Sequence, residues 1–114
     1  MPSRLLIVDD ERLIRWSLEQ TLAKAGYEVS TASTAEAAIA AVREDPPDLI
    51  LLDLKLPDTD GLQVLRQVKE LSPHVQVLIM TAYADVGTAV EAMKLGAYDY
   101  LPKPIDFENL AVTL

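Results

Sequence analysis

Short apolar runs alternate along the chain with longer segments in which apolar residues recur every three or four positions. The runs have the length and composition of strands and occupy residues 5–8, 27–32, 48–52, 75–80 and 98–101. The intervening segments have helical periodicity and cover about 11–25, 35–43, 62–71 and 85–95, and a fifth opens at Asp106 or Phe107 and runs to Leu114. This alternation with short connections predicts a parallel sheet with right-handed crossovers and helices on both faces.

Local signals predict the ends and the faces of these helices. The first helix should end at Gly26, and its inward stripe is Ile14, Leu18, Leu22 and Ala25. Ser33 or Thr34 can cap the second helix, and Ser33 stands three residues before Glu36, which is the spacing of a capping box. The helix at 85–95 presents three apolar residues on one side: Val86, Val90 and Met93.

The run from Leu49 to Leu52 predicts a strand buried on both faces, as in the middle of a parallel sheet. Asp53 appears where that strand should end, and open α/β sheets collect their ligands and chemistry outside the carboxyl ends of the strands. We therefore expect residues 1–114 to form one domain, a flavodoxin-like (βα)5 three-layer sandwich with strand order 2-1-3-4-5 and a truncated last helix.

Composition narrows the classes of function. The formal net charge is -8, with 18 acidic and 10 basic residues, which argues against nucleic-acid binding because phosphate contacts need clustered Lys and Arg. The absence of Cys excludes disulfides, thiol nucleophiles and thiolate metal sites. The apolar runs are far shorter than the roughly 18–20 residues of a membrane span. We expect a cytoplasmic protein with no membrane association.

Polar residues follow four of the five predicted strands. They are Asp9 and Asp10 after the first, Asp53 after the third, Thr81 after the fourth and Lys103 just past the fifth. In the order 2-1-3-4-5 these four strands are neighbours, so all of the polar groups should converge on one edge of the sheet.

These groups have the chemistry of a phosphoryl-transfer site. Carboxylates crowded together repel unless a cation lies among them, and an open site with oxygen ligands suits Mg²⁺. Cation, ammonium and hydroxyl groups together are what a dianionic phosphoryl group requires around it. Asp53 can then act as a nucleophile and become an acyl phosphate, since a carboxylate is already ionised at pH 7.

The sequence resembles the receiver domains of two-component response regulators over essentially its whole length. The resemblance rests on motifs in the family's order and spacing: Asp9-Asp10-Glu11, Asp53 with Pro57 and Gly61, Thr81-Ala82 and Lys103-Pro104. It implies that Asp53 accepts phosphate from a sensor histidine kinase, and that the protein is a phosphoacceptor switch rather than an enzyme.

The same resemblance implies a role for each residue of the site. Asp10, Asp53 and the backbone carbonyl of Lys55 would bind Mg²⁺, with Asp9 acting through water. Thr81 and the amide of Ala82 would hold the phosphoryl oxygens, Lys103 would pair with them, and Tyr100 would be the aromatic switch.

A closer likeness is to the receivers of NtrC-like activators. It rests on Ile14-Arg15-Trp16-x-Leu18-Glu19, on Met80-Thr81-Ala82-Tyr83 and on residues 96–104. It implies an effector, an ATPase with a DNA-binding domain, C-terminal to this chain. The resemblance to receiver domains in general implies dimerisation through the face made by the fourth helix, the fifth strand and the fifth helix.

Other interpretations remain open from the residues alone. A flavodoxin-like cofactor binder would need a Ser/Thr/Gly-rich loop where this chain has Asp9-Asp10-Glu11, and a haloacid-dehalogenase-type phosphatase would need an Asp where Lys55 stands. A docking module that is never phosphorylated is a further alternative.

Three other residues are interpreted without a role in the site. Asp58 and Asp60 are interpreted as solvated loop acids. Trp16 lies roughly 200° around the first helix from Ile14 and should point away from the core.

Overall fold

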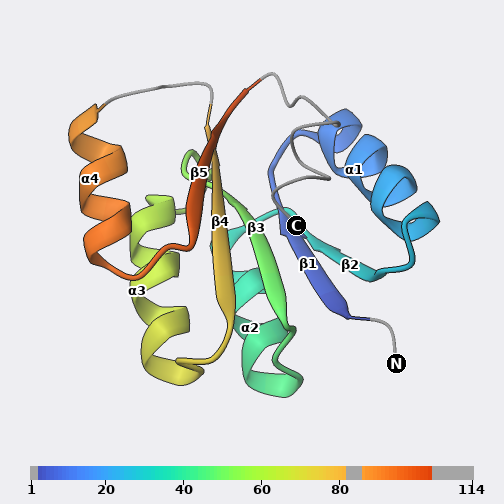
Figure 1. Ribbon diagram of the computed structural model, residues 1–114, viewed down its shortest axis with the longest axis horizontal. Coiled ribbons are helices and arrows are strands. Elements are labelled where there is room, and N and C mark those ends of the chain that lie inside the picture. The colour runs from blue at the N-terminus through green and yellow to red at the C-terminus, as the bar shows by residue number, and fades with distance from the viewer. Residues whose placement is uncertain (1–2, 82–85, 104–114) are drawn as a thin grey trace.

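The computed structural model describes residues 3–81 and 86–103 of the chain, and these form one layered α/β unit (Figure 1). The strands are β1 (Arg4–Val8), β2 (Glu28–Ala32), β3 (Leu49–Asp53), β4 (Gln76–Thr81) and β5 (Asp99–Pro102). The helices are α1 (Arg12–Lys24), α2 (Ala35–Glu44), α3 (Gly61–Leu71) and α4 (Val86–Lys94). The predicted fifth helix and Ala82 lie outside the described residues.

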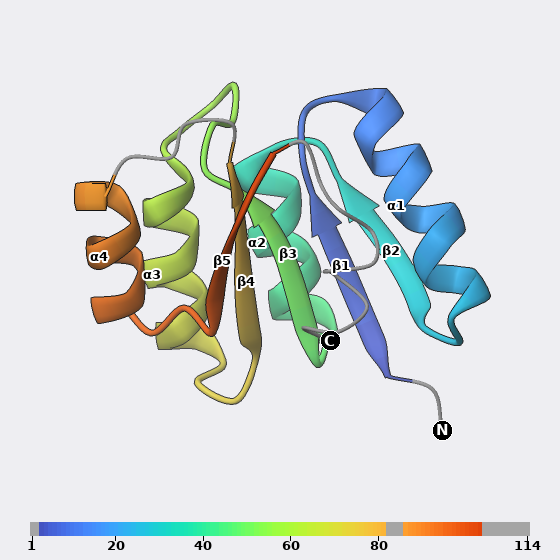
Figure 2. The same ribbon diagram turned by 45° about the horizontal axis from the view of Figure 1, so that its top comes forward.

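All the strand pairs are parallel, and the sheet has the order β2-β1-β3-β4-β5 (Figure 2). The predicted fold class and strand order are therefore confirmed. β3 lies at the centre of the sheet, between β1 and β4, and its backbone hydrogen bonds are shared with both neighbours. The strand that ends in Asp53 is thus held from both sides.

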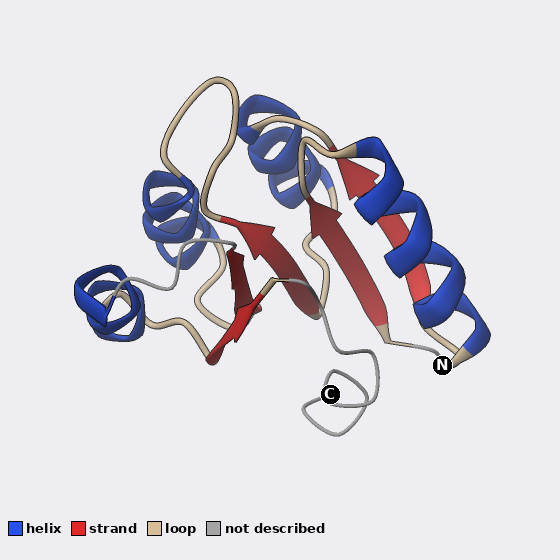
Figure 3. Cartoon of the chain, turned by 90° about the horizontal axis from the view of Figure 1, so that it is seen from above, coloured by secondary structure: helices blue, strands red, loops and turns tan. Residues whose placement is uncertain are grey.

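The sheet separates two apolar cores. On one face the side chains of α1 that reach the core, Leu18 and Leu22, pack with alternate strand residues such as Leu51. On the other face α2, α3 and Ala92 of α4 pack with the remaining strand residues, among them Ile50 and Leu52. Viewed from above, α1 lies on one side of the sheet and the other helices on the opposite side (Figure 3). Burial of β3 on both faces is confirmed.

The predicted inward stripe of α1 is confirmed for Ile14, Leu18 and Leu22 but is wrong for Ala25, and part of the predicted face of α4 is also wrong. Ala25 is exposed, because α1 ends at Lys24 and the chain turns through Gly26, whose φ of 101° favours glycine. On α4 the residue that faces the core is Ala92, which is fully buried, whereas Val90 and Met93 are 47% and 46% exposed. Several apolar residues on one short helix define a broad apolar stripe, so the pattern alone does not show which of them faces the core. The small side chain of Ala92 fits where the helix lies closest to the sheet.

The cap of α2 is Thr34 rather than Ser33. The hydroxyl of Thr34 accepts a hydrogen bond from the backbone N–H of Ala37 at 3.1 Å.

The predicted exposure of Trp16 is confirmed, since 60% of its surface is accessible. Among the described residues, no helix is long and apolar enough to cross a membrane.

Candidate functional site

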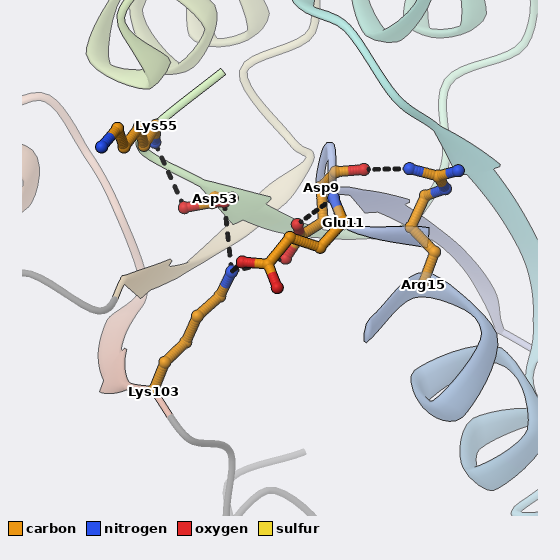
Figure 4. A network of polar contacts seen from close by, with 6 residues as sticks. All are labelled: Asp9, Glu11, Arg15, Asp53, Lys55 and Lys103. Carbon is orange, nitrogen blue, oxygen red and sulfur yellow. Dashed lines mark hydrogen bonds and ion pairs between the residues drawn. The ribbon is translucent and has the colours of Figure 1, made fainter. Parts of the chain in front are cut away.

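The carboxyl ends of β1, β3, β4 and β5 bring the predicted polar residues to one edge of the sheet (Figure 4). The strand register explains their proximity, because Val8 pairs with Leu52, Asp53 with Met80 and Thr81 with Pro102. Residues that are distant in sequence therefore end at the same level. Asp9, Asp53 and Thr81 are the buried polar residues of the described chain.

The ammonium group of Lys103 holds the centre of this edge. Its Nζ lies 2.7 Å from Oδ2 of Asp9 and 3.1 Å from Oδ2 of Asp53, with Oε1 of Glu11 further away at 3.7 Å. The side chains of Lys103, Asp9 and Asp53 are only 8%, 0% and 5% exposed. One buried cation thus serves two buried carboxylates.

Burial and mutual charge change the proton affinity of these groups. The pKa of Asp53 is raised, chiefly by burial and also by the negative charge of Asp9. The hydrogen bond from the N–H of Lys55 and the positive charge of Lys103 act in the opposite direction but do not outweigh burial. Burial lowers the pKa of Lys103, but the hydrogen bonds and charges of Asp9 and Asp53 outweigh it, and the pKa is raised overall. Lys103 is therefore fully charged at neutral pH.

Three carboxylates at this edge fit a divalent cation. Asp9, Asp10 and Asp53 each offer an oxygen, and these oxygens lie within 4.8 Å of one another. Asp10 is exposed to solvent, so the group opens outward. Hard oxygen ligands on an open face are the environment that Mg²⁺ prefers.

The loop between β3 and α3 folds tightly back on the end of β3. The N–H of Lys55 donates to Oδ1 of Asp53 at 3.2 Å, and Lys55 also forms an isolated antiparallel bridge with Asp60. Where the loop returns, a Cβ on Gly61 would lie 2.5 Å from Cα of Leu54. Only glycine fits this close approach of two backbone segments.

Other predicted residues lie where the sequence placed them. Thr81 is buried at the end of β4, and its carbonyl accepts a hydrogen bond from the N–H of Lys103 at 2.8 Å. Tyr100 on β5 is partly buried and packs against the core on the side of α2 and α3.

Sequence reasoning missed two residues of this edge. Arg15 of α1 donates from Nη1 to the backbone carbonyl of Asp9 at 2.7 Å and so ties the helix to the loop after β1 (Figure 4). The carboxylate of Glu11, which directly precedes α1, lies 3.7 Å from the ammonium group of Lys103. The available signal was their position two and six residues after Asp9, at the start of α1.

A five-stranded flavodoxin-like sheet with a buried acidic cluster at its carboxyl edge defines the class of domain. The chain belongs to the response regulator receiver domain family of two-component signalling, with a match that covers residues 5–114. This family assignment disfavours the cofactor-binding alternative.

Similar curated proteins regulate transcription. The chain is 46% identical over 110 residues to the transcriptional regulatory protein ZraR of Escherichia coli K12, covering 96% of this chain and 25% of that protein. It is 44% identical over 103 residues to the DNA-binding transcriptional regulator NtrC of Salmonella typhimurium, covering 90% of this chain and 22% of that one. The chain thus spans about a quarter of the length of these relatives.

Solved structures agree with the fold. A receiver domain protein (CheY-like) from Methanospirillum hungatei superposes with a TM-score of 0.95 at 35% identity, covering 98% of this chain and 90% of that one. A response regulator from Burkholderia pseudomallei, solved with a phosphorylated aspartic acid and a calcium ion, gives 0.92 at 31% identity, covering 98% and 66%.

Proposed function

We propose that this domain is a phosphoacceptor switch in which Asp53 receives a phosphoryl group from a phosphohistidine of a sensor histidine kinase. The observation that carries the proposal is the buried carboxylate of Asp53 at the centre of the sheet, 3.1 Å from Lys103. The Burkholderia relative that carries a phosphorylated aspartic acid supports it. Residues 1–114 would then be one receiver domain of a longer regulator.

In the proposed transfer, a carboxylate oxygen of Asp53 attacks phosphorus as the bond from phosphorus to the histidine nitrogen breaks. The electron pair of that bond returns to the imidazole, and an acyl phosphate forms on Asp53. Lys103, already within hydrogen-bonding distance, pairs with the new phosphoryl oxygens. Thr81 and the amide of Ala82 contribute the remaining donors.

The acidic cluster would bind Mg²⁺. Asp10, Asp53 and the backbone carbonyl of Lys55 are the proposed ligands, with Asp9 acting through water. The cation would neutralise charge that accumulates on the phosphoryl oxygens during transfer.

Phosphorylation would act by population shift between two packings of α4 and β5. Thr81 would turn toward the phosphate and Tyr100 would move into the space that it leaves. The output would be dimerisation through the face that includes α4 and β5, where Val90 and Met93 are exposed.

A C-terminal effector, an ATPase with a DNA-binding domain, is proposed because the chain covers only about a quarter of the length of the similar transcriptional regulators. Such a regulator would work in the cytoplasm.

The test is phosphorylation with acetyl phosphate and Mg²⁺, followed by intact-mass spectrometry. The wild-type protein should gain one acid-labile phosphate, and Asp53→Asn should gain none. Asp48→Asn is a matched control, because Asp48 directly precedes β3 at the end opposite to Asp53, and it should be phosphorylated like the wild type. A wild-type protein with no adduct would contradict the proposal.

A further inference from the structure

One exposed carboxylate ties the loop between β3 and α3 sideways to α2. Oδ1 of Asp58 accepts a hydrogen bond from the N–H of Ala35 at 2.9 Å, and Oδ2 accepts one from the N–H of Glu36 at 3.0 Å. These two hydrogen bonds hold the pKa of Asp58 below its ordinary value. Asp58 is exposed, as expected of a solvated loop acid, and it also accepts these two hydrogen bonds from α2.

The link is more than a helix cap. α2 has its own cap, since the hydroxyl of Thr34 accepts from Ala37 and the carbonyl of Thr34 accepts from Ala38. Asp58 takes the two N–H groups that remain in the first turn, from a position more than twenty residues later in the chain. Both oxygens of one side chain are used, which fixes the direction as well as the distance of the contact.

Packing supports the inner side of the loop more than its outer side. Leu54 and Leu56, the neighbours of Lys55, are buried and anchor its inner face to the core. Between α2 and α3, however, lies an open hollow of about 380 Å³, bordered by Ala35, Glu36 and Thr59 among others. At this outer side, the two hydrogen bonds of Asp58 hold the loop to the first turn of α2.

We propose that Asp58 is a positioning residue that holds the Lys55 segment in place for metal binding. Lys55 stands three residues before Asp58, and its N–H already contacts Asp53. When the loop is free to swing from α2, the carbonyl of Lys55 and Oδ1 of Asp53 lose their fixed relation. The inference rests on the proposed function, because that function makes Lys55 a ligand of Mg²⁺.

The same loop supplies a matched control. Asp60 is also an exposed acid and also caps a helix, with its Oδ1 accepting from the N–H of Leu62 at 2.9 Å. Asp58→Ala and Asp60→Ala each remove one charge and one helix-capping side chain. Only Asp58→Ala cuts the link to α2, so a difference between the two variants isolates that link.

The first measurement is the Mg²⁺ dissociation constant, from NMR titration of the wild type and the variants. We expect Asp58→Ala to bind Mg²⁺ about tenfold more weakly, at the lower end of the effect of outer-shell partners. Asp60→Ala should stay within about twofold of the wild type, even where its melting temperature falls. Asp58→Asn, which keeps one carbonyl acceptor, should lie between Asp58→Ala and wild type and serves if the alanine variant folds poorly.

The second measurement is amide hydrogen exchange without Mg²⁺. Ala35, Glu36 and Lys55 should exchange faster in Asp58→Ala than in Asp60→Ala. Equal Mg²⁺ affinity in the two variants, or unchanged exchange at Lys55, would overturn the inference while leaving the proposed function intact. A wild-type protein that does not bind Mg²⁺ would instead count against the proposed metal site, and exchange at Lys55 would still decide the role of Asp58.

Discussion

The two ends of the sheet carry similar ion pairs in opposite surroundings. At the amino edge the guanidinium of Arg4 contacts the carboxylate of Asp45 at 2.7 Å, and their side chains are 35% and 69% exposed. At the carboxyl edge Lys103 contacts Asp9 at the same distance, and these side chains are 8% and 0% exposed. The contacts match in length and differ in access to water.

This difference in exposure changes what each pair contributes to stability. Exposed ion pairs contribute little to stability, because water and salt screen them. Buried charges carry a desolvation cost that an apolar replacement would avoid. The cluster of Asp9, Asp53 and Lys103 is thus a costly way to stabilise a fold, which is consistent with a role in chemistry.

The largest expected effect comes from removing the buried cation. Lys103→Met leaves Asp9 and Asp53 facing each other without a counter-ion, and should lower the free energy of unfolding by about 3 kcal/mol without Mg²⁺. Because the pKa of Lys103 is raised above 10.5, its contribution is fully present at pH 7 and is lost only as pH rises through the raised value. Urea denaturation at pH 7 measures the change.

Lys94→Met is the control for that substitution, since Lys94 is exposed on α4. Its effect should stay within about 0.5 kcal/mol. If Lys103→Met and Lys94→Met lowered the free energy of unfolding equally, the buried position of Lys103 would contribute nothing special to stability.

Adding the metal should have the next largest effect. Mg²⁺ at ten times its dissociation constant should raise the free energy of unfolding by about 1.4 kcal/mol, because it binds the folded state selectively. The gain should disappear with a chelator and be much smaller in Asp53→Asn. A urea titration with and without Mg²⁺ checks this, and stabilisation that is equally large in the variant would place the ion elsewhere.

Neutralising the carboxylate of Asp53 should stabilise the protein without metal. Asp53→Asn should raise the free energy of unfolding by about 1 kcal/mol at pH 7, since it removes a buried charge while Lys103 keeps Asp9. The pKa of Asp53 in the folded protein is raised above its ordinary value of 3.8. As pH rises from 3.8 through the raised pKa, the wild type therefore loses stability relative to the variant. Below pH 3.8 the two should converge, and a difference that persists there would contradict the sign.

The same chemical change at the amino edge should have a small effect of opposite sign. Asp45→Asn should lower the free energy of unfolding by about 0.5 kcal/mol, because it weakens an exposed pair with Arg4. Added salt should shrink the difference between wild type and variant. An effect that does not depend on salt would mean that the hydrogen bonds of Arg4 to the backbone of Asp45 and Pro46 decide it.

The fold was predictable because its signals are local and repeated. Runs such as Leu49–Leu52 and stops such as Gly26 identify strands and helix ends within a few residues. The orientation of α4 was not predictable, because the choice of Ala92 over Val90 as the core residue depends on how closely the helix approaches the sheet.

The members of the site were predictable from topology, which places the ends of neighbouring parallel strands together. Their pairing was not. That Lys103 bridges Asp9 and Asp53 depends on side-chain reach, and that Asp58 accepts from Ala35 depends on a contact across two segments. No spacing along the chain encodes either contact.

The bridge by Lys103 also sets an order of assembly. Its partner Asp9 lies 94 residues earlier, and Lys103 directly follows β5, which stands at the edge of the sheet. During synthesis the acidic pair emerges first and has no lysine partner until the last of these strands docks. A chain in which β5 has not docked therefore lacks the cation that pairs with Asp9 and Asp53. The bridge therefore joins the two ends of the described chain, and it forms only when β1 and β5 are both in the sheet.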